Sequence, residues 1–382
     1  MRHRQALALA ALALLLSACK RGSSRSSTEG PHTSPAPHPQ EAPKHEAAAR
    51  GDVKPPLRGL VSMGAYKFVP EWGEPDNSMA TVDKKAGLLQ GVVILATWRN
   101  LQKSANGGLT EDNEIDQGLA AVRKYNQEHP NAPLAVKLRV WGGFFAPEWA
   151  MHESGGPVHL IHTNNKGTEL KRMVGKVWSQ PYRKAWARLQ ELLAAKYDAD
   201  PLIREVAVTS CQMFTAEPFF IDTHETALEP LRKAGMTDAA YKECLDGIVH
   251  DYAPWKTTRF ETPLNPFRLT DGPKPKHDEA FTLAWMKRCH AEEPTRCAFD
   301  NHDLDVHVEK GLETLYEAME KSGAEVEFQS GPAAPKDLDG MIRRAVSTGG
   351  TSVELWQDYQ GFPEMADAEL RRSAKLLEDN RK

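Results

Sequence analysis

Eight short runs of apolar and β-branched residues recur from about residue 57 to the end of the chain, and stretches with helical spacing separate them. Such repeated alternation is typical of a (β/α)₈ barrel, in which parallel strands form a ring inside a layer of helices. We therefore predict an α/β fold, a single (β/α)₈ TIM barrel over residues 57–382. The expected strands are Gly59–Ala65, Gly91–Trp98, Leu134–Trp141, Glu205–Cys211, Thr257–Thr262, Arg296–His302, Glu325–Gln329 and Thr351–Trp356.

The fourth of these runs leads to the first candidate for chemistry. Residues Glu205–Cys211 contain no glycine or proline and have the composition of a strand buried on both faces. A polar segment follows, with one acid, Glu217, next to Pro218. Enzymes of this fold carry their active sites at the C-terminal ends of the strands, so Glu217 is a candidate catalytic acid.

The first residues have the pattern of an export signal. Arg2 and Arg4 precede an apolar run, residues 6–16, which is too short to span a membrane as a mature helix. The run ends in Leu-Ser-Ala-Cys, which resembles a bacterial lipobox and implies cleavage after residues 1–18 and lipidation of Cys19. Lys20 in place of an aspartate favours the outer membrane. We expect a lipid-anchored protein of the bacterial cell envelope, at the outer membrane or its periplasmic face; an ordinary secretory signal is the alternative.

Residues 19–56 contain serine, proline, glutamate, alanine, histidine and lysine but almost no large apolar residue. Such a segment buries too little apolar surface to offset its chain entropy, so we predict a disordered linker. The formal net charge is −4, and no basic patch alternates with aromatic residues. We therefore expect no nucleic-acid partner.

Four cysteines remain after Cys19, in a compartment that permits disulfides. Cys289 and Cys297 flank a short loop and could form one bond. Cys211 and Cys244 could form a second or remain buried thiols, and spacing alone does not decide between these states.

Aromatic and polar residues gather at the expected strand ends. Indole rings beside carboxylates and amides commonly line sugar-binding clefts, because the rings stack on sugar C–H faces while the polar groups bind hydroxyls. Any one tryptophan is more often part of the core, but the recurrence at one end of successive strands favours a carbohydrate substrate. The predicted substrate-binding residues are Trp98, Arg139, Trp141, Asp300, His302, Gln329 and Trp356.

Three motifs carry a family resemblance. Residues 98–101, Trp-Arg-Asn-Leu, residues 140–149, Val-Trp-Gly-Gly-Phe-Phe-Ala-Pro-Glu-Trp, and Ala216-Glu217-Pro218 resemble segments of clan A glycoside hydrolases. The third is similar to their Asn-Glu-Pro, which implies that Glu217 is the acid/base. Two positions depart from the pattern: Ala216 replaces the asparagine, and Gln329 stands where the family has its nucleophile.

Hydrolysis by this mechanism needs a second carboxylate across the glycosidic bond. In the last strand Ser352, Glu354 and Trp356 share one face, so Glu354 points into the barrel if Trp356 does. Glu354 would remain ionised if Arg139 or Arg99 reaches it. We predict Glu354 as the partner and Glu327, two residues before Gln329, as the alternative nucleophile. Glu261 and Asp300 are further candidates for the second carboxylate.

Two other functions remain open from the sequence. The chain could be a non-catalytic carbohydrate-binding lipoprotein on a degenerate hydrolase barrel, which Ala216 and Gln329 favour. It could also be a metal-dependent barrel hydrolase centred on Asp300 and His302, although their spacing fits neither a helical zinc motif nor a calcium loop. We expect neither a metal nor another cofactor.

Overall fold

The structure is a computed structural model that describes residues 52–67, 79–163, 167–272, 274–357 and 361–380. The predicted signal peptide, Cys19 and nearly all of the predicted linker lie outside these residues. The chain from Ala49 to Lys382 forms one compact unit. None of the helices in the described ranges is long and apolar enough to cross a membrane.

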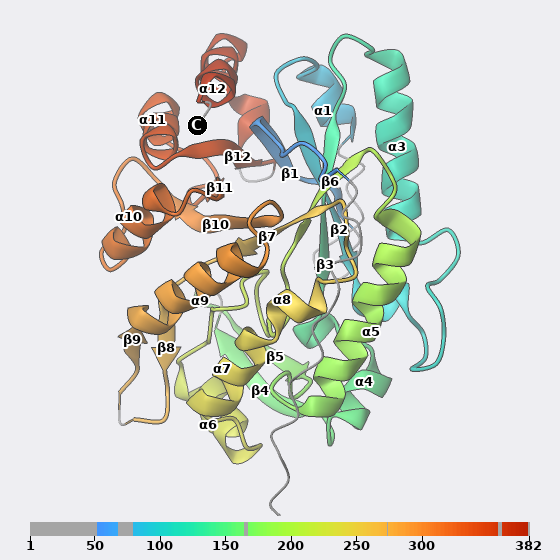
Figure 1. The fold of residues 1–382 in the computed structure, drawn as a ribbon, viewed down its shortest axis with the longest axis vertical. Helices are drawn as coiled ribbons and strands as arrows, with labels where there is room; N and C mark the ends of the chain where they lie inside the picture. Colours follow the sequence, from blue (N-terminus) through green and yellow to red (C-terminus); the bar gives the residue numbers. More distant parts are fainter. Residues whose placement is uncertain (1–51, 68–78, 164–166, 273, 358–360, 381–382) are drawn as a thin grey trace, which may run out of the picture. The chain divides into compact units, whose positions relative to one another are not determined.

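Eight parallel strands close into a barrel in the order β1-β12-β11-β10-β7-β6-β3-β2 (Figure 1). This confirms the predicted (β/α)₈ fold. Closure is made by β1, which pairs in parallel with both β12 and β2. The barrel strands are β1 Gly59–Lys67, β2 Gly91–Thr97, β3 Ala135–Trp141, β6 Ile203–Ala207, β7 Arg259–Pro263, β10 Cys297–Leu304, β11 Glu325–Ser330 and β12 Gly350–Trp356.

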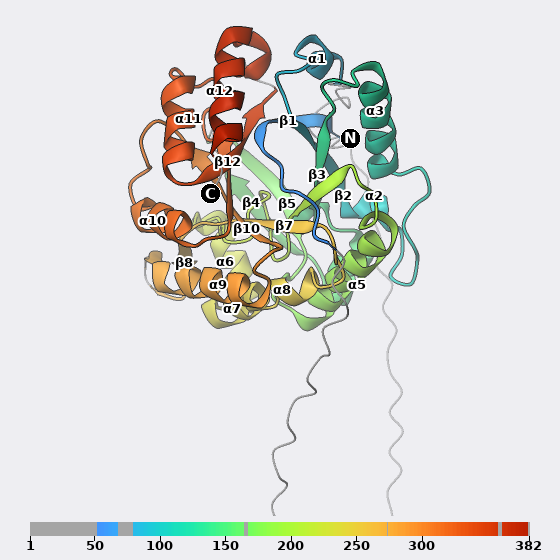
Figure 2. The same cartoon turned by 45° about the horizontal axis from the view of Figure 1, so that its top comes forward.

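Helices surround the strands (Figure 2). Between them and the outward faces of the strands lies a large apolar core, which includes Ile94, Leu138 and Phe328. The described helices are α1 Met79–Lys84, α2 Trp98–Leu101, α3 Glu114–Glu128, α4 Glu148–Glu153, α5 Gln180–Tyr197, α6 Glu225–Lys233, α7 Asp238–Asp246, α8 Ile248–Asp251, α9 Glu279–Glu292, α10 Glu313–Lys321, α11 Leu338–Ser347 and α12 Asp367–Asp379, with short 3₁₀ turns at Gly143–Phe145 and Phe362–Glu364.

Two antiparallel hairpins are added to the barrel. The first pairs β4 Val158–Thr163 with β5 Glu169–Val174, in the excursion between the third and fourth barrel strands. The second pairs β8 Phe267–Leu269 with β9 Lys276–Asp278 and follows the fifth barrel strand. Both hairpins follow the C-terminal end of a barrel strand, which is the end where this fold carries its function.

The fourth barrel strand ends earlier than predicted. β6 stops at Ala207, whereas the apolar run continues to Cys211. The backbone turns at Cys211, whose φ of 65° lies in the left-handed region. Cys211 is bonded to Cys244 of α7, and the second disulfide joins Cys289 to Cys297. The last four residues of the run, 208–211, therefore begin a loop that is anchored to a helix.

Candidate active site

The inside of the barrel is charged, not apolar, on the side formed by β3, β7, β10, β11 and β12. Side chains that point inward from these strands are fully or almost fully buried. Parallel pairing sets them at matching heights, for example Gln329 beside Glu354 and Asp300 beside Glu327. They are Lys137, Arg139, Glu261, Asp300, His302, Glu327, Gln329 and Glu354, with Glu205 from β6. This interior differs from the branched apolar filling that is usual for the fold.

Arg139 and Glu354 form the central ion pair. Arg139 Nη2 donates to both carboxylate oxygens of Glu354, at 2.9 Å each, and Nη1 lies 3.4 Å from Gln329 Oε1. Burial alone would raise the pKa of Glu354, but the charges of Arg139 and Lys137 outweigh it and hold the pKa below its ordinary value. Arg139 therefore reaches Glu354 and favours its ionised form, as the sequence suggested.

Lys137 lies below this pair, surrounded by glutamates. Its Nζ is 2.6 Å from Glu327, 2.9 Å from Glu354, 3.6 Å from Glu261 and 3.8 Å from Glu205. Although burial opposes its charge, these acids raise the pKa of Lys137 well above its ordinary value, so it stays cationic.

Too few cations are present to balance every acid in this cluster. Burial, with the charge of Glu205, raises the pKa of Glu327 well above its ordinary value, and burial, with the charge of Asp300, does the same for Glu261. Both shifts favour a protonated side chain. Glu327 also accepts a hydrogen bond from Ser352 Oγ at 3.0 Å and is fully buried. We call this buried group of Lys137 and its glutamates the charged floor of the barrel. A carboxylate enclosed there does not resemble a nucleophile that is open to substrate.

Asp300 and His302 form a second buried pair, with 3.1 Å between Oδ2 and Nε2. Burial opposes both charges, but each stabilises the other, so the pKa of Asp300 is lowered and the pKa of His302 is raised. The charge of Glu217 also raises the pKa of His302, and the charge of His302 lowers the pKa of Glu354. His302 therefore lies within electrostatic reach of both predicted catalytic acids.

Glu217 lies in the loop after β6, ten residues beyond the end of the strand, and its side chain is only partly buried. Its Oε1 accepts a 2.7 Å hydrogen bond from Asn265 Nδ2, which follows β7. An acid that is partly open to solvent and held by a neutral amide can exchange protons with a ligand. The structure thus brings Glu217 to the strand ends by way of the loop, not by extension of the strand.

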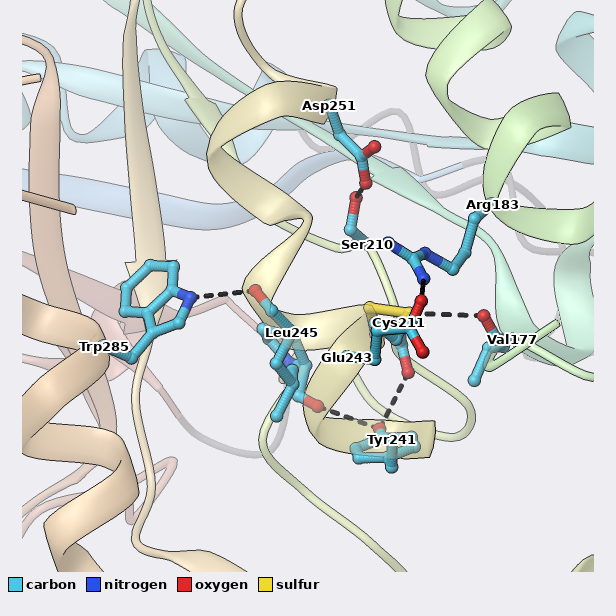
Figure 3. Close-up of a disulfide and its surroundings, with 11 residues drawn as sticks. Val177, Arg183, Ser210, Cys211, Tyr241, Glu243, Leu245, Asp251 and Trp285 are labelled. Atoms are coloured by element: carbon cyan, nitrogen blue, oxygen red, sulfur yellow. Dashed lines mark hydrogen bonds and ion pairs between the residues drawn. A yellow bond between two sulfur atoms is a disulfide. The ribbon is translucent and has the colours of Figure 1, made fainter. Parts of the chain in front are cut away.

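The disulfide and Tyr241 hold this loop (Figure 3). The Tyr241 hydroxyl lies 2.8 Å from the carbonyl oxygen of Cys211 and 2.9 Å from that of Pro218, so one side chain of α7 contacts both ends of the segment that contains Glu217. Ser210 Oγ donates to Asp251 at 2.7 Å, and burial raises the pKa of Asp251 to about 7. A loop of irregular backbone is thereby fixed by covalent and buried polar contacts.

Two residues of the site were not predicted as such from the sequence. Asn265 positions Glu217. Asp303, partly buried on β10, has a pKa raised to about 6 by burial and by the charges of Glu217 and Glu309. The run of acidic residues and histidines after Phe299 could have pointed to Asp303 as a site residue. Because Asp303 lies at a register shift in β10, however, strand alternation does not predict the direction of its side chain.

The predicted tryptophans separate into two groups. Trp141 is 8% exposed and contacts Phe145 on the inside of the barrel. Trp356 is partly buried at the end of β12 and donates from Nε1 to the Ser330 carbonyl at 2.7 Å. Trp98 is fully buried in the outer core, so the prediction that it binds substrate is wrong for this conformation. Its ring packs edge-on against Trp149, Tyr182 and Trp186.

Glu261, Asp300 and His302 form a group that could hold a metal, with ligand atoms within 4.8 Å of one another. The oxygens of Glu261 and Oδ1 of Asp300 have no hydrogen-bond partner in the described residues. However, Lys137 Nζ lies 3.6 Å from Glu261, and Asp300 already pairs with His302. A cation would meet repulsion from Lys137 and would displace that pair, so the donor set fits a metal poorly.

No protein-family description matches this chain, and no curated protein matches it in sequence. Endo-glycoceramidase II from Rhodococcus sp., in complex with ganglioside GM3, is 14% identical, with a TM-score of 0.47 over 85% of this chain and 81% of that one. A β-galactosidase from Marinomonas ef1 is 12% identical, with a TM-score of 0.47 over 84% and 58%. A β-galactosidase from Bacillus circulans sp. alkalophilus is 13% identical, with a TM-score of 0.44 over 79% and 50%. These similarities concern general architecture, and the barrel described above rests on its own strand pairing.

Proposed function

We propose that this chain is a glycoside hydrolase-like lipoprotein of the bacterial cell envelope that acts on a carbohydrate, with Glu217 as general acid/base. The observation that supports this most is the Glu217–Asn265 hydrogen bond at 2.7 Å, made by a partly open acid at the strand ends above a floor of buried charge. A proton donor to a glycosidic oxygen needs this combination of access and fixed direction.

The partner carboxylate in this proposal is Glu354. A nucleophile or base has to be ionised at working pH, and the ion pair with Arg139 favours that state. Glu354 is fully buried, so Arg139 would have to shift one of its contacts for substrate to reach the carboxylate. Asp303 is the rival, because it is more open and interacts electrostatically with Glu217.

The test is hydrolysis of a panel of aryl glycosides and oligosaccharides by the wild type and by Glu217→Gln. We expect the substitution to slow turnover by about 10²–10⁴-fold while glycan binding is retained. Glu225→Gln, a solvent-exposed change in α6, is the matched control and should leave turnover unchanged. Equal rates for Glu217→Gln and the wild type would contradict the proposed role.

Two outcomes would replace the proposal with another function. Binding of a glycan without turnover by the wild type would favour a carbohydrate-binding protein on a degenerate barrel. Activity that is lost with a chelator and restored by a divalent metal would favour the group Glu261, Asp300 and His302 as a metal-dependent hydrolytic centre.

A further inference from the structure

A cavity with a basic lining lies beside the barrel mouth. Its volume is about 660 Å³, and its walls come from the segments that follow β2 and β3 and from the β4–β5 hairpin. Four of its lining residues are cationic, namely Arg99, Lys103, Lys171 and Arg172, while Glu148 is the one acid among them. This excess of positive charge is local, because the chain as a whole is acidic.

The two cationic side chains on β5 are not neutralised by a carboxylate of the described residues. Within the part of the chain that the structure describes, no carboxylate pairs with Lys171 or Arg172. The Nε of Arg172 is buried with no acceptor there, although Nη1 donates to the Lys171 carbonyl at 3.1 Å. A guanidinium with spare donors binds carboxylates and sulfates well, because its planar N–H groups match their paired oxygens.

Aromatic rings complete the cavity. Phe144 and Trp149 line it, and the Arg172 guanidinium lies 5.2 Å from the centre of the Phe144 ring, which limits its movement. Flat apolar faces beside cations suit a ligand that has both a ring with C–H faces and an anionic group. A small inorganic anion would use the cations but not the rings.

A row of aromatic contacts joins the wall of the cavity to the inside of the barrel. Phe144 contacts Phe145, with 4.3 Å between ring centres, and Phe145 contacts Trp141 inside the barrel at 5.2 Å. The Phe144 N–H donates to the Met213 carbonyl, in the same loop as Glu217. The approach is so close that a Cβ at Gly143, whose φ is 55°, would lie 2.3 Å from the Met213 oxygen. The wall of the cavity therefore packs directly against the loop that contains Glu217.

We propose that the cavity between the β3 end and the β4–β5 hairpin binds an acidic sugar unit, a uronate or a sulfated residue, of the glycan that this chain acts on. This inference rests on the proposed function and specifies its substrate class. Lys171 and Arg172 bind the anionic group, and Phe144 and Trp149 stack on the ring.

Binding is measured for the full chain by Trp fluorescence and calorimetry. The ligands are an oligogalacturonide, a chondroitin sulfate oligosaccharide and an alginate oligosaccharide. Each is compared with its neutral counterpart, made by carboxyl reduction and, for the chondroitin sulfate, by desulfation as well. We expect at least one acidic glycan to bind about tenfold more tightly than its neutral form. The affinity should fall as ionic strength rises from about 0.05 M to about 0.5 M, because salt screens exposed charges.

The matched variants are a double change in the cavity, Lys171→Gln with Arg172→Gln, and a double change on the exposed surface of α12, Arg371→Gln with Lys375→Gln. The first should weaken acidic-glycan binding about tenfold and the second should not change it. If every acidic glycan binds no better than its neutral form, or if the two double variants behave alike, the proposal is overturned. Binding to phosphatidylglycerol vesicles that the cavity variant alone loses would also overturn it, in favour of a lipid headgroup.

Its failure can be told apart from failure of the proposed function. Tight binding of an acidic glycan without cleavage by the wild type would leave this inference standing and end the hydrolase proposal. If acidic and neutral glycans are cleaved alike and the cavity variant cleaves them as the wild type does, the hydrolase proposal would stand and the inference of an acidic sugar site would be overturned.

Discussion

Arg139 Nη2 lies 2.9 Å from both carboxylate oxygens of Glu354, in the middle of a barrel where neither side chain has appreciable contact with solvent. A buried ion pair is costly to assemble, but removing one partner is worse, because the remaining charge is left without compensation. The two residues therefore have to be considered together in any experiment on this site.

Glu354→Gln should lower the free energy of unfolding by about 3–5 kcal/mol at neutral pH, because Arg139 would be left unpaired. Chemical denaturation monitored by circular dichroism measures this. Glu325→Gln is the matched control, since its partner Arg58 lies near solvent and such pairs contribute about 0–1 kcal/mol. Equal losses in the two variants would mean that Arg139 finds another partner in the barrel.

Glu327→Gln should be much milder, with a pH dependence of its own. The folded-state pKa of Glu327 is raised, so its contribution to stability is complete below the unfolded pKa, about 4.3, and declines as pH rises toward the folded value. Glutamine does not titrate and can accept from Lys137 and Ser352. The variant should therefore gain stability relative to the wild type as the pH rises above about 4.5, by at most about 1.4 kcal/mol per pH unit. A difference in unfolding free energy that is constant with pH would contradict a protonated Glu327.

Tyr241→Phe should reduce turnover more than it reduces glycan binding. The change leaves the carbonyls of Cys211 and Pro218 without their shared donor, at a cost of about 1–3 kcal/mol, and loosens the segment that holds Glu217. Tyr197→Phe removes a buried hydroxyl on α5, away from this loop, and should affect stability but not kcat. If both variants keep full kcat, the loop does not depend on Tyr241 for its catalytic geometry.

Strand positions and their inward residues were predictable because both follow from local patterns. Alternation identifies Lys137, Arg139 and Trp141 as one face of β3, and parallel pairing brings the strand ends together. The same alternation explains the error at Trp98: Val93 and Leu95 face inward, whereas Ile94, Ala96 and Trp98 belong to the outer core. A residue just beyond the end of a strand is predicted to lie near the barrel mouth. Whether its side chain points into the barrel or into the outer core depends on its place in the alternation of the strand.

The charged floor could not be predicted, because its contacts join residues far apart in sequence. Lys137 pairs with Glu327 across 190 positions, and no local pattern indicates that one ammonium contacts four glutamates. The position of Glu217 depends on a backbone turn at Cys211 and on Asn265, from another strand end. Loops of this kind are set by tertiary contacts and not by the composition of the segment.

Cys19→Ser should release the protein from the membrane fraction of a bacterial host into the soluble periplasm. The basis is the lipobox-like sequence at residues 16–19, where the thiol of Cys19 would carry the lipid. Mass spectrometry of the wild type should show a mature chain that begins at an acylated Cys19. A mature terminus elsewhere, or membrane association that persists in the variant, would contradict lipid anchoring.

Asp303→Asn tests which carboxylate works with Glu217. The pKa of Asp303 is raised to about 6, so its contribution to stability is complete below about pH 4 and is lost as pH rises to about 6. If Asp303 is the ionised partner, kcat/KM should increase through pH 6 in the wild type, and the variant should lose this limb together with about 10²-fold or more in rate. Asp305→Asn, two residues further along, is the control and should keep the wild-type profile. If Asp303→Asn keeps the limb and only Glu354→Gln abolishes turnover, the partner is Glu354, and Arg139 has to move aside during the reaction, because it holds both oxygens that the substrate would need.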